Sequence, residues 1–173
     1  AVDEACIGDT VIFTPSVTSV SGLAPLGDTI WLINGVPVSV PTRFAPNLSH
    51  VFTQAGNNTV TLIVGTVDGC YDTTVHNISI NPLPTLIAGP DQRICLGQSV
   101  TITAQSNANI YQWTPSTTLS CNDCSSPSAS PQSTTRYLVT ATSSQGCSRV
   151  DSVLVTVILP FTMNVSDNDT ICV

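Results

Sequence analysis

The chain has 173 residues, with 11 acidic side chains against four basic ones and a net charge of −7. Nucleic-acid-binding proteins need a basic footprint and anionic lipid attracts basic clusters, so this charge argues against both kinds of partner. No apolar run reaches the roughly 18 residues of a membrane helix, and no signal-peptide pattern opens the chain. We therefore expect no membrane insertion.

Short runs of alternating apolar and polar residues fill the first half of the chain, and this period of two predicts β-strands. Asn34-Gly35 directly follows one run and is a strong hairpin signal. No apolar stripe repeats with the 3.6-residue period of a helix, so we expect essentially no helix. The predicted strands of this half are residues 10–14, 29–33, 58–66 and 71–80.

The second half of the chain repeats the pattern of the first. The motif Cys-aliphatic-Gly at Cys6 recurs at Cys95, and the Gly-Cys turn at Cys70 recurs at Cys147. Each half also holds one tryptophan, which we expect to lie in the core of its domain. The predicted strands of the second half are residues 100–104, 136–142 and 148–158.

A repeat of about 80 residues makes each unit a domain and not a solenoid rung. We predict domains at residues 1–82 and 83–160, and we read 161–173 as the first strand of a truncated third repeat, since Cys172 restarts the pattern. Short strands at regular spacing indicate an immunoglobulin-like β-sandwich. The predicted fold class is therefore all-β, with tandem sandwich domains placed end to end by a proline-stiffened linker.

Several segments resemble PKD domains and the related PKD-like repeats of Bacteroidetes surface proteins. In the first unit the resemblance lies in His50-Val51-Phe52, Gly56 and the strand 59–64, although the acidic signature of PKD domains is absent after Trp31. The resemblance therefore does not imply a calcium site. In the second unit the matching segments are residues 94–100, 111–115, 129–131, 134–137 and 146–147.

This resemblance implies a non-enzymatic stalk or adhesin segment of a large protein exported by the type IX secretion system, a group that includes gliding-motility adhesins. The implied location is extracellular or on the cell surface. The implied partners are surface glycans or proteins and neighbouring repeats of the same chain. The alternative hypothesis is an accessory or carbohydrate-binding region of a secreted hydrolase.

Seven cysteines in a chain without lysine indicate an oxidising compartment. Because the repeat makes Cys6 equivalent to Cys95 and Cys70 equivalent to Cys147, we predict the disulfides Cys6–Cys70 and Cys95–Cys147. Each would close a long loop, which favours a large entropic stabilisation. We expect Cys172 to pair within the remainder of the third repeat.

Cys121 and Cys124 occur only in the second unit, and three interpretations are open. A local disulfide is the first. Free thiols are the second. A metal or redox site is the third, but zinc needs two more ligands and a redox Cys-x-x-Cys usually opens a helix. Prolines surround the pair, so we favour a disulfide that staples a proline-rich crossover loop.

We find no catalytic constellation, and predict no enzyme, no cofactor and no metal site. No nucleophile-elbow motif accompanies the two histidines. Asp167 and Asp169 offer oxygen ligands that suit Ca²⁺, but an ordinary turn explains them as well.

Five positions match, by resemblance, the O-glycosylation motif of Bacteroidetes export pathways, which is Asp, then Ser or Thr, then an aliphatic residue or Thr. The same motif also arises by chance where a strand begins, because Asp suits turns and Thr suits strands. A chain with so few charges gains hydration from O-glycans. The candidate acceptors are Thr10, Thr29, Thr73, Ser152 and Thr170.

Overall fold

The computed structural model describes residues 3–16, 26–38 and 47–161. All regular structure in these residues is β-strand, as the alternating pattern predicts. The chain divides into two compact units, residues 1–83 and 84–173. Among the described residues, no helical segment has the length and hydropathy of a membrane span. The proposed strand at residues 161–173 lies, apart from residue 161, outside the described part of the chain.

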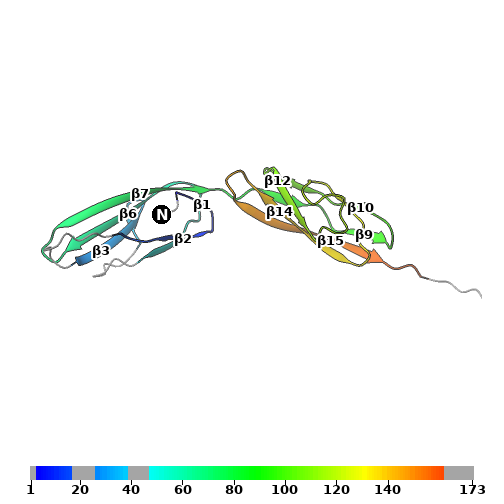
Figure 1. The fold of residues 1–173 in the computed structure, drawn as a ribbon, viewed down its shortest axis with the longest axis horizontal. Coiled ribbons are helices and arrows are strands. Elements are labelled where there is room, and N and C mark those ends of the chain that lie inside the picture. The colour runs from blue at the N-terminus through cyan, green and yellow to red at the C-terminus, as the bar shows by residue number, and fades with distance from the viewer. Residues whose placement is uncertain (1–2, 17–25, 39–46, 162–173) are drawn as a thin grey trace, which may run out of the picture. The chain divides into compact units, whose positions relative to one another are not determined.

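Unit 1 is a sandwich of a five-stranded sheet and a two-stranded sheet. The two long strands of the larger sheet form its centre, and the first strand pairs in parallel with the last (Figure 1). The larger sheet has the order β1 (Glu4–Cys6), β7 (Tyr71–Asn81), β6 (Gly56–Thr66), β3 (Leu26–Ile33) and β4 (Val36–Pro37), and the smaller one pairs β2 (Thr10–Phe13) with β5 (Leu48–Val51).

The hairpin predicted at Asn34-Gly35 is confirmed. Both residues have positive φ, 51° and 80°, which a two-residue hairpin turn of the favoured twist requires. Ile33 pairs with Val36 across the turn. The Asn34 side chain adds to this, because its Oδ1 accepts a hydrogen bond of 2.9 Å from the Thr59 amide of β6.

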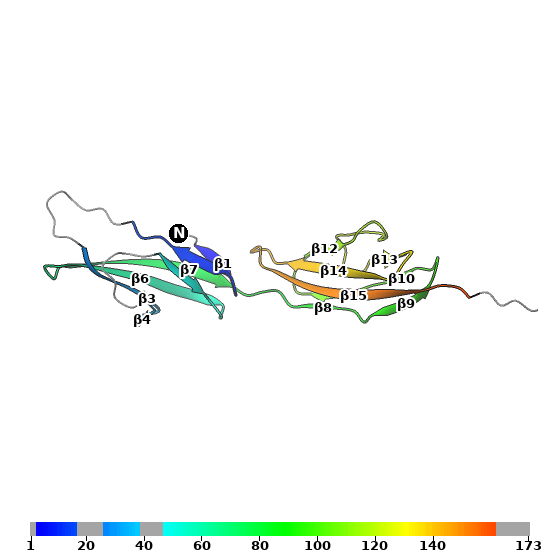
Figure 2. The ribbon, with the colours of Figure 1, turned by 90° about the horizontal axis from the view of Figure 1, so that it is seen from below.

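Unit 2 repeats the plan with a four-stranded sheet and two short two-stranded sheets (Figure 2). The four-stranded sheet again joins an early strand in parallel to the last strand. Its order is β12 (Ile110–Thr114), β14 (Thr135–Thr142), β15 (Ser148–Ile158) and β9 (Gln92–Cys95), and the short sheets pair β10 (Val100–Thr101) with β13 (Ser128–Ala129) and β11 (Ala104–Ser106) with β8 (Leu86–Ala88).

The predicted strand at 100–104 is divided into β10 and β11. Burial still alternates through the break, because Ile102 and Ala104 are buried and Thr103 between them is exposed. The division arises because β10 pairs with β13 whereas β11 pairs with β8, so the chain changes partner within one apolar-alternating run. Pairing partners depend on residues far along the chain, which local periodicity does not report.

Each unit has its own hydrophobic core, and its tryptophan lies within it as predicted. Trp31 is 5% exposed and Trp113 is fully buried. Side chains from the facing sheets fill both cores, which is the packing of immunoglobulin-like sandwiches. The fold is thus all-β, with two immunoglobulin-like units in tandem.

Candidate functional site

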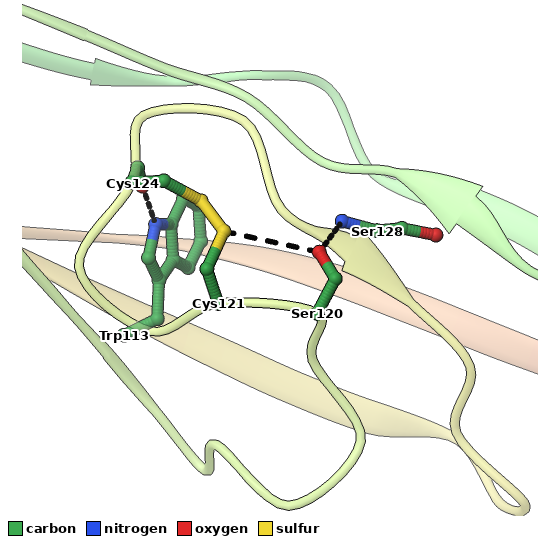
Figure 3. Close-up of a disulfide and its surroundings, with 5 residues drawn as sticks. All are labelled: Trp113, Ser120, Cys121, Cys124 and Ser128. Atoms are coloured by element: carbon green, nitrogen blue, oxygen red, sulfur yellow. Dashed lines mark hydrogen bonds between the residues drawn. A yellow bond between two sulfur atoms is a disulfide. The ribbon is translucent and has the colours of Figure 1, made fainter.

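The crossover loop of unit 2 carries a disulfide between Cys121 and Cys124, as predicted, with a Cα–Cα distance of 5.9 Å. The loop folds over the buried indole of Trp113, whose Nε1–H donates a hydrogen bond of 2.8 Å to the Cys124 carbonyl oxygen (Figure 3). The Trp113 amide donates to the Asn122 carbonyl at 2.7 Å. The disulfide therefore constrains the segment from Cys121 to Cys124, which covers Trp113 and accepts its hydrogen bonds.

The same loop is tied to the two-stranded sheets of unit 2. The amides of Ile102 and Ala104 donate to the carbonyls of Pro127 and Ser125, at 3.0 and 2.8 Å. Ser120 Oγ accepts a bond of 2.9 Å from the Ser128 amide. With its backbone groups paired in this way, the loop forms part of the sandwich wall, and the disulfide has a structural role.

The predicted disulfides Cys6–Cys70 and Cys95–Cys147 are wrong. Cys70 and Cys95 carry free, exposed thiols, whereas Cys6 and Cys147 are each disulfide-bonded. The reason is the length of the last strand in each unit. Cys6 pairs with Asn81 at the end of β7, and Cys70 lies just before its start, so the 11 residues of β7 separate them.

A strand of that length spans roughly 35 Å, whereas the Cα atoms of a disulfide lie within about 7 Å of each other. The same geometry recurs in unit 2, where Cys95 pairs with Ile158 and Cys147 precedes the 11 residues of β15. The two cysteines that recur in both repeats thus lie at opposite ends of each repeat. The last predicted partner, Cys172, lies outside the described residues.

The candidate glycosylation sites differ in exposure. Thr10 and Thr73 are exposed and Ser152 is half-buried, so their hydroxyls reach the surface of each unit. Thr29 is only 1% exposed, and its Oγ is buried without a hydrogen-bond partner. A glycan on Thr29 is incompatible with the folded unit, and that prediction is wrong. Thr170 lies outside the described residues.

The acidic residue of this motif has a local role at two of the sites. Oδ1 of Asp72 accepts a bond of 2.8 Å from the Thr73 amide, and Oδ1 of Asp151 does the same for Ser152. The other oxygen of Asp151 accepts from the Ala88 amide at 2.8 Å. Those amides, Ala88 first, hold the pKa of Asp151 below its usual value, and the nearby Arg149 adds to the effect.

Unit 1 holds a shallow hollow of roughly 230 Å³ beside its aromatic residues. Phe13, Trp31 and His76 line it, and the ring of Phe13 lies 6.3 Å from that of Trp31 and 6.1 Å from that of His76. Phe13 and Trp31 are both at most 5% exposed. Their faces are therefore covered by their neighbours, and the hollow offers little of the flat aromatic surface on which sugar rings stack.

The two histidines of unit 1 have different neighbours. His76 Nε2 lies 3.6 Å from the Asp3 carboxylate at the exposed surface, and the ring of His50 packs edge-on against Phe52. Within the described ranges, no group of three or more His, Cys, Asp or Glu side chains comes together as metal ligands would. Asp167 and Asp169, the calcium candidates, lie outside those ranges.

No protein-family model matches the chain, and no curated protein matches it. Among solved structures, it is similar to the fibronectin(III)-like modules of CbhA from Clostridium thermocellum, with 13% identity, a TM-score of 0.43 and 95% of each chain covered. The insect immune protein hemolin shares 18% identity at a TM-score of 0.45, over 90% of this chain and 44% of hemolin.

The eight N-terminal immunoglobulin domains of the Down syndrome cell adhesion molecule share 18% identity at a TM-score of 0.42, over 89% of this chain and 23% of that one. The chain thus spans less than half of hemolin and of this adhesion molecule. At such identities the likeness concerns the fold alone, so the function has to be argued from the residues themselves.

Proposed function

We propose that this chain is a non-enzymatic stalk or adhesin segment of a larger secreted or cell-surface protein. The observation that carries the proposal is the state of its cysteines: Cys6 of unit 1 and Cys121, Cys124 and Cys147 of unit 2 are all disulfide-bonded. Disulfides persist in oxidising compartments, outside the reducing cytosol. Repeated sandwich domains that carry disulfides suit a segment that acts as an extracellular spacer or attaches a cell to a surface.

The pairing of the long strands supports a mechanical role. In unit 1, β6 and β7 pair over ten consecutive residue positions, and in unit 2, β14 and β15 pair over eight. Each of these ladders holds the last strand of its unit to its neighbour by backbone hydrogen bonds along its length. Force applied along the chain therefore meets many hydrogen bonds at once before a last strand detaches.

The finer form of the proposal is a bacterial protein of the Bacteroidetes type, exported by the type IX system and active in adhesion or gliding motility. The resemblance of residues 94–100 and 111–115 to PKD-like repeats supports it. This form includes O-glycans at the accessible acceptors Thr10, Thr73 and Ser152. An intact mass equal to the bare sequence, measured on protein from its natural source, would exclude the glycans.

The function is tested on intact cells that produce the parent protein. We expect antibodies against unit 2 to label unpermeabilised cells, and their Fab fragments to reduce attachment of those cells to a surface. Labelling that requires permeabilisation would contradict the proposal. Fab fragments against a cytosolic protein serve as the control.

The alternative function, binding of carbohydrate for a secreted hydrolase, has the hollow at Trp31 as a candidate site. A glycan array probed with the 173-residue chain tests it directly. Binding that is lost in Trp31→Phe, with unit 1 still folded, would favour the carbohydrate-binding function. Failure to bind any glycan would leave the stalk or adhesin function unopposed.

A further inference from the structure

The outward face of the larger sheet of unit 1 carries an exposed aromatic ring. Thr74 and His76 of β7 line the hollow on the core side of this sheet. Because side chains alternate along a strand, Tyr71 lies on the opposite, outward face. Tyr71 is 67% exposed, whereas the tryptophan and the described phenylalanines of unit 1 are at most 5% exposed.

Gly65 makes room for this ring. It pairs with Tyr71 across β6 and β7, and it is buried although it lies on the outward face. A Cβ at position 65 would lie 2.7 Å from Cε1 of Tyr71 and 3.0 Å from its Cδ1, so one edge of the ring fills the space of the missing side chain. Because the glycine meets only that edge, the faces of the ring stay open to solvent. An aromatic face carries negative charge density and attracts cations.

Three exposed carboxylates lie at the same end of the sheet. The carbonyl oxygen of Asp28 in β3 is 3.5 Å from the Cβ position of Gly65, and Asp68 and Asp72 lie on either side of Tyr71 along the chain. The described residues of unit 1 include no Lys or Arg, and within them none of these three carboxylates forms an ion pair. The ring and the carboxylates therefore present a negative potential to the solvent.

Unit 2 lacks these features in the matching hairpin. Counted from the repeated Gly-Cys turn and its strand pairing, the equivalents are Gln145 for Asp68, Ser148 for Tyr71, Arg149 for Asp72 and Thr142 for Gly65. The same hairpin forms in both units, so its folding does not require the aromatic ring, the glycine or the acids. Their presence in unit 1 alone points to a role other than folding.

We propose that the Tyr71 platform, which comprises Tyr71, Gly65 and the carboxylates of Asp28, Asp68 and Asp72, binds a cationic side chain from a basic segment of a partner protein. Charge complementarity selects this occupant, because the carboxylates attract a basic segment and repel an acidic one. Arginine suits the platform best, since its planar guanidinium stacks on an aromatic face and always carries a charge. In the proposed adhesin this is where a partner attaches, a role that rests on the proposed function.

The test is an NMR titration of the ¹⁵N-labelled chain with a capped octapeptide of alternating glycine and arginine. We expect amide shifts centred on Gly65 and Tyr71, without shifts at Thr142 and Ser148 of unit 2. Binding should weaken between about 50 mM and about 500 mM salt, because exposed charges are screened. The same peptide with glutamate in place of arginine is the control and should not bind.

Substitutions of the ring and its glycine identify the contact. We expect Tyr71→Ala to weaken binding roughly two- to five-fold, the effect of an exposed cation–π contact, and Tyr71→Phe to retain it. Gly65→Ala should weaken binding as Tyr71→Ala does, because the new Cβ displaces the ring. The clash is with the outer part of a rotatable side chain, so the sheet itself can stay folded. Thr142→Ala is the matched control in unit 2 and should have no effect.

The carboxylates are tested together, with Asp28→Asn, Asp68→Asn and Asp72→Asn in one chain. This variant keeps side-chain size and an acceptor for the Thr73 amide, and we expect weaker binding with a smaller salt dependence. Equal binding by wild type and Tyr71→Ala, or no binding at low salt, would overturn the proposal. So would a neutral glycan that binds at Tyr71 while the arginine peptide does not.

These measurements use the purified chain, whereas the proposed function is tested by labelling intact cells. Loss of peptide binding with cells still labelled would therefore overturn the platform alone. Peptide binding without cell labelling would overturn the proposed function and leave the platform standing.

Discussion

The two units share one strand plan but stabilise it differently. Unit 2 buries the centre of its core completely, with Trp113, Tyr137, Val139 and Val153 all at 0% exposure and only its margin reaching up to 7%, and a disulfide-stapled loop closes it. In unit 1 the core residues retain between 1% and 8% exposure, and a hollow lies beside Trp31. The difference teaches that an immunoglobulin-like plan fixes where the core lies, whereas the loop that covers it decides how well it is sealed.

Replacing the central tryptophan should reveal the largest difference in stability between the two units. We expect Trp113→Ala to lower the free energy of unfolding of unit 2 by about 4 kcal/mol, since it removes a fully buried side chain and leaves the Cys124 carbonyl without its donor. Trp31→Ala should cost unit 1 less, because Trp31 already borders a hollow. Hydrogen exchange of β14 and β6 amides measures each unit separately. Equal losses would contradict the comparison.

Removing the staple is the next largest change. We expect Cys121→Ser with Cys124→Ser to destabilise unit 2 by about 2 kcal/mol on the chain-entropy estimate for so short a loop. Urea unfolding followed by Trp113 fluorescence, in a Trp31→Phe background, measures this. Cys70→Ser, which removes a free thiol of unit 1, is the control and should leave the urea midpoint of unit 2, read by Trp113, unchanged.

Acid should weaken unit 2 through Asp151. The pKa of its carboxyl is lowered in the folded state, so the ionised form stabilises the fold above the ordinary pKa near 3.8, and this stabilisation is lost as the pH falls through the folded pKa. At pH 7 we expect Asp151→Asn to cost about 1 kcal/mol. Its unfolding free energy should also fall less steeply below pH 4, and an unchanged pH profile would contradict this role.

The smallest effect should have the opposite sign. Thr29 buries a hydroxyl with no hydrogen-bond partner in the core of unit 1, so Thr29→Val exchanges it for a methyl group of similar size. We expect a gain of about 1 kcal/mol in the unfolding free energy of unit 1. Thr10→Val, at an exposed position, is the matched control and should change little.

The strands and hairpins were predictable from sequence because their signals are local. The alternation of residues 58–66 and the positive-φ pair Asn34-Gly35 specify β6 and the β3–β4 turn without tertiary information. The Cys121–Cys124 disulfide was predictable for the same reason. The burial of Thr29 was predictable too, since in a strand it shares a face with Trp31.

The bonding states of Cys6, Cys70, Cys95 and Cys147 could not be inferred from the repeat. Equivalence between Cys6 and Cys95 shows that the two occupy the same position, but it does not show what lies beside them. The overlooked signal was length: the strand run that begins after Cys70 is too long to return that cysteine to the level of Cys6. Which cysteines lie close enough to bond depends on the register of the sheet, and the sequence pattern does not reveal that register.

Alkylation of the unreduced chain, isolated from its natural source and followed by mass measurement of its peptides, tests the central claim of a disulfide-bearing, extracellular segment most directly. The account predicts that Cys6, Cys121, Cys124 and Cys147 react with the alkylating agent only after a reductant is added, because all four are disulfide-bonded. Cys70 and Cys95 should react without reductant. Alkylation of the first four cysteines before reduction would contradict the account.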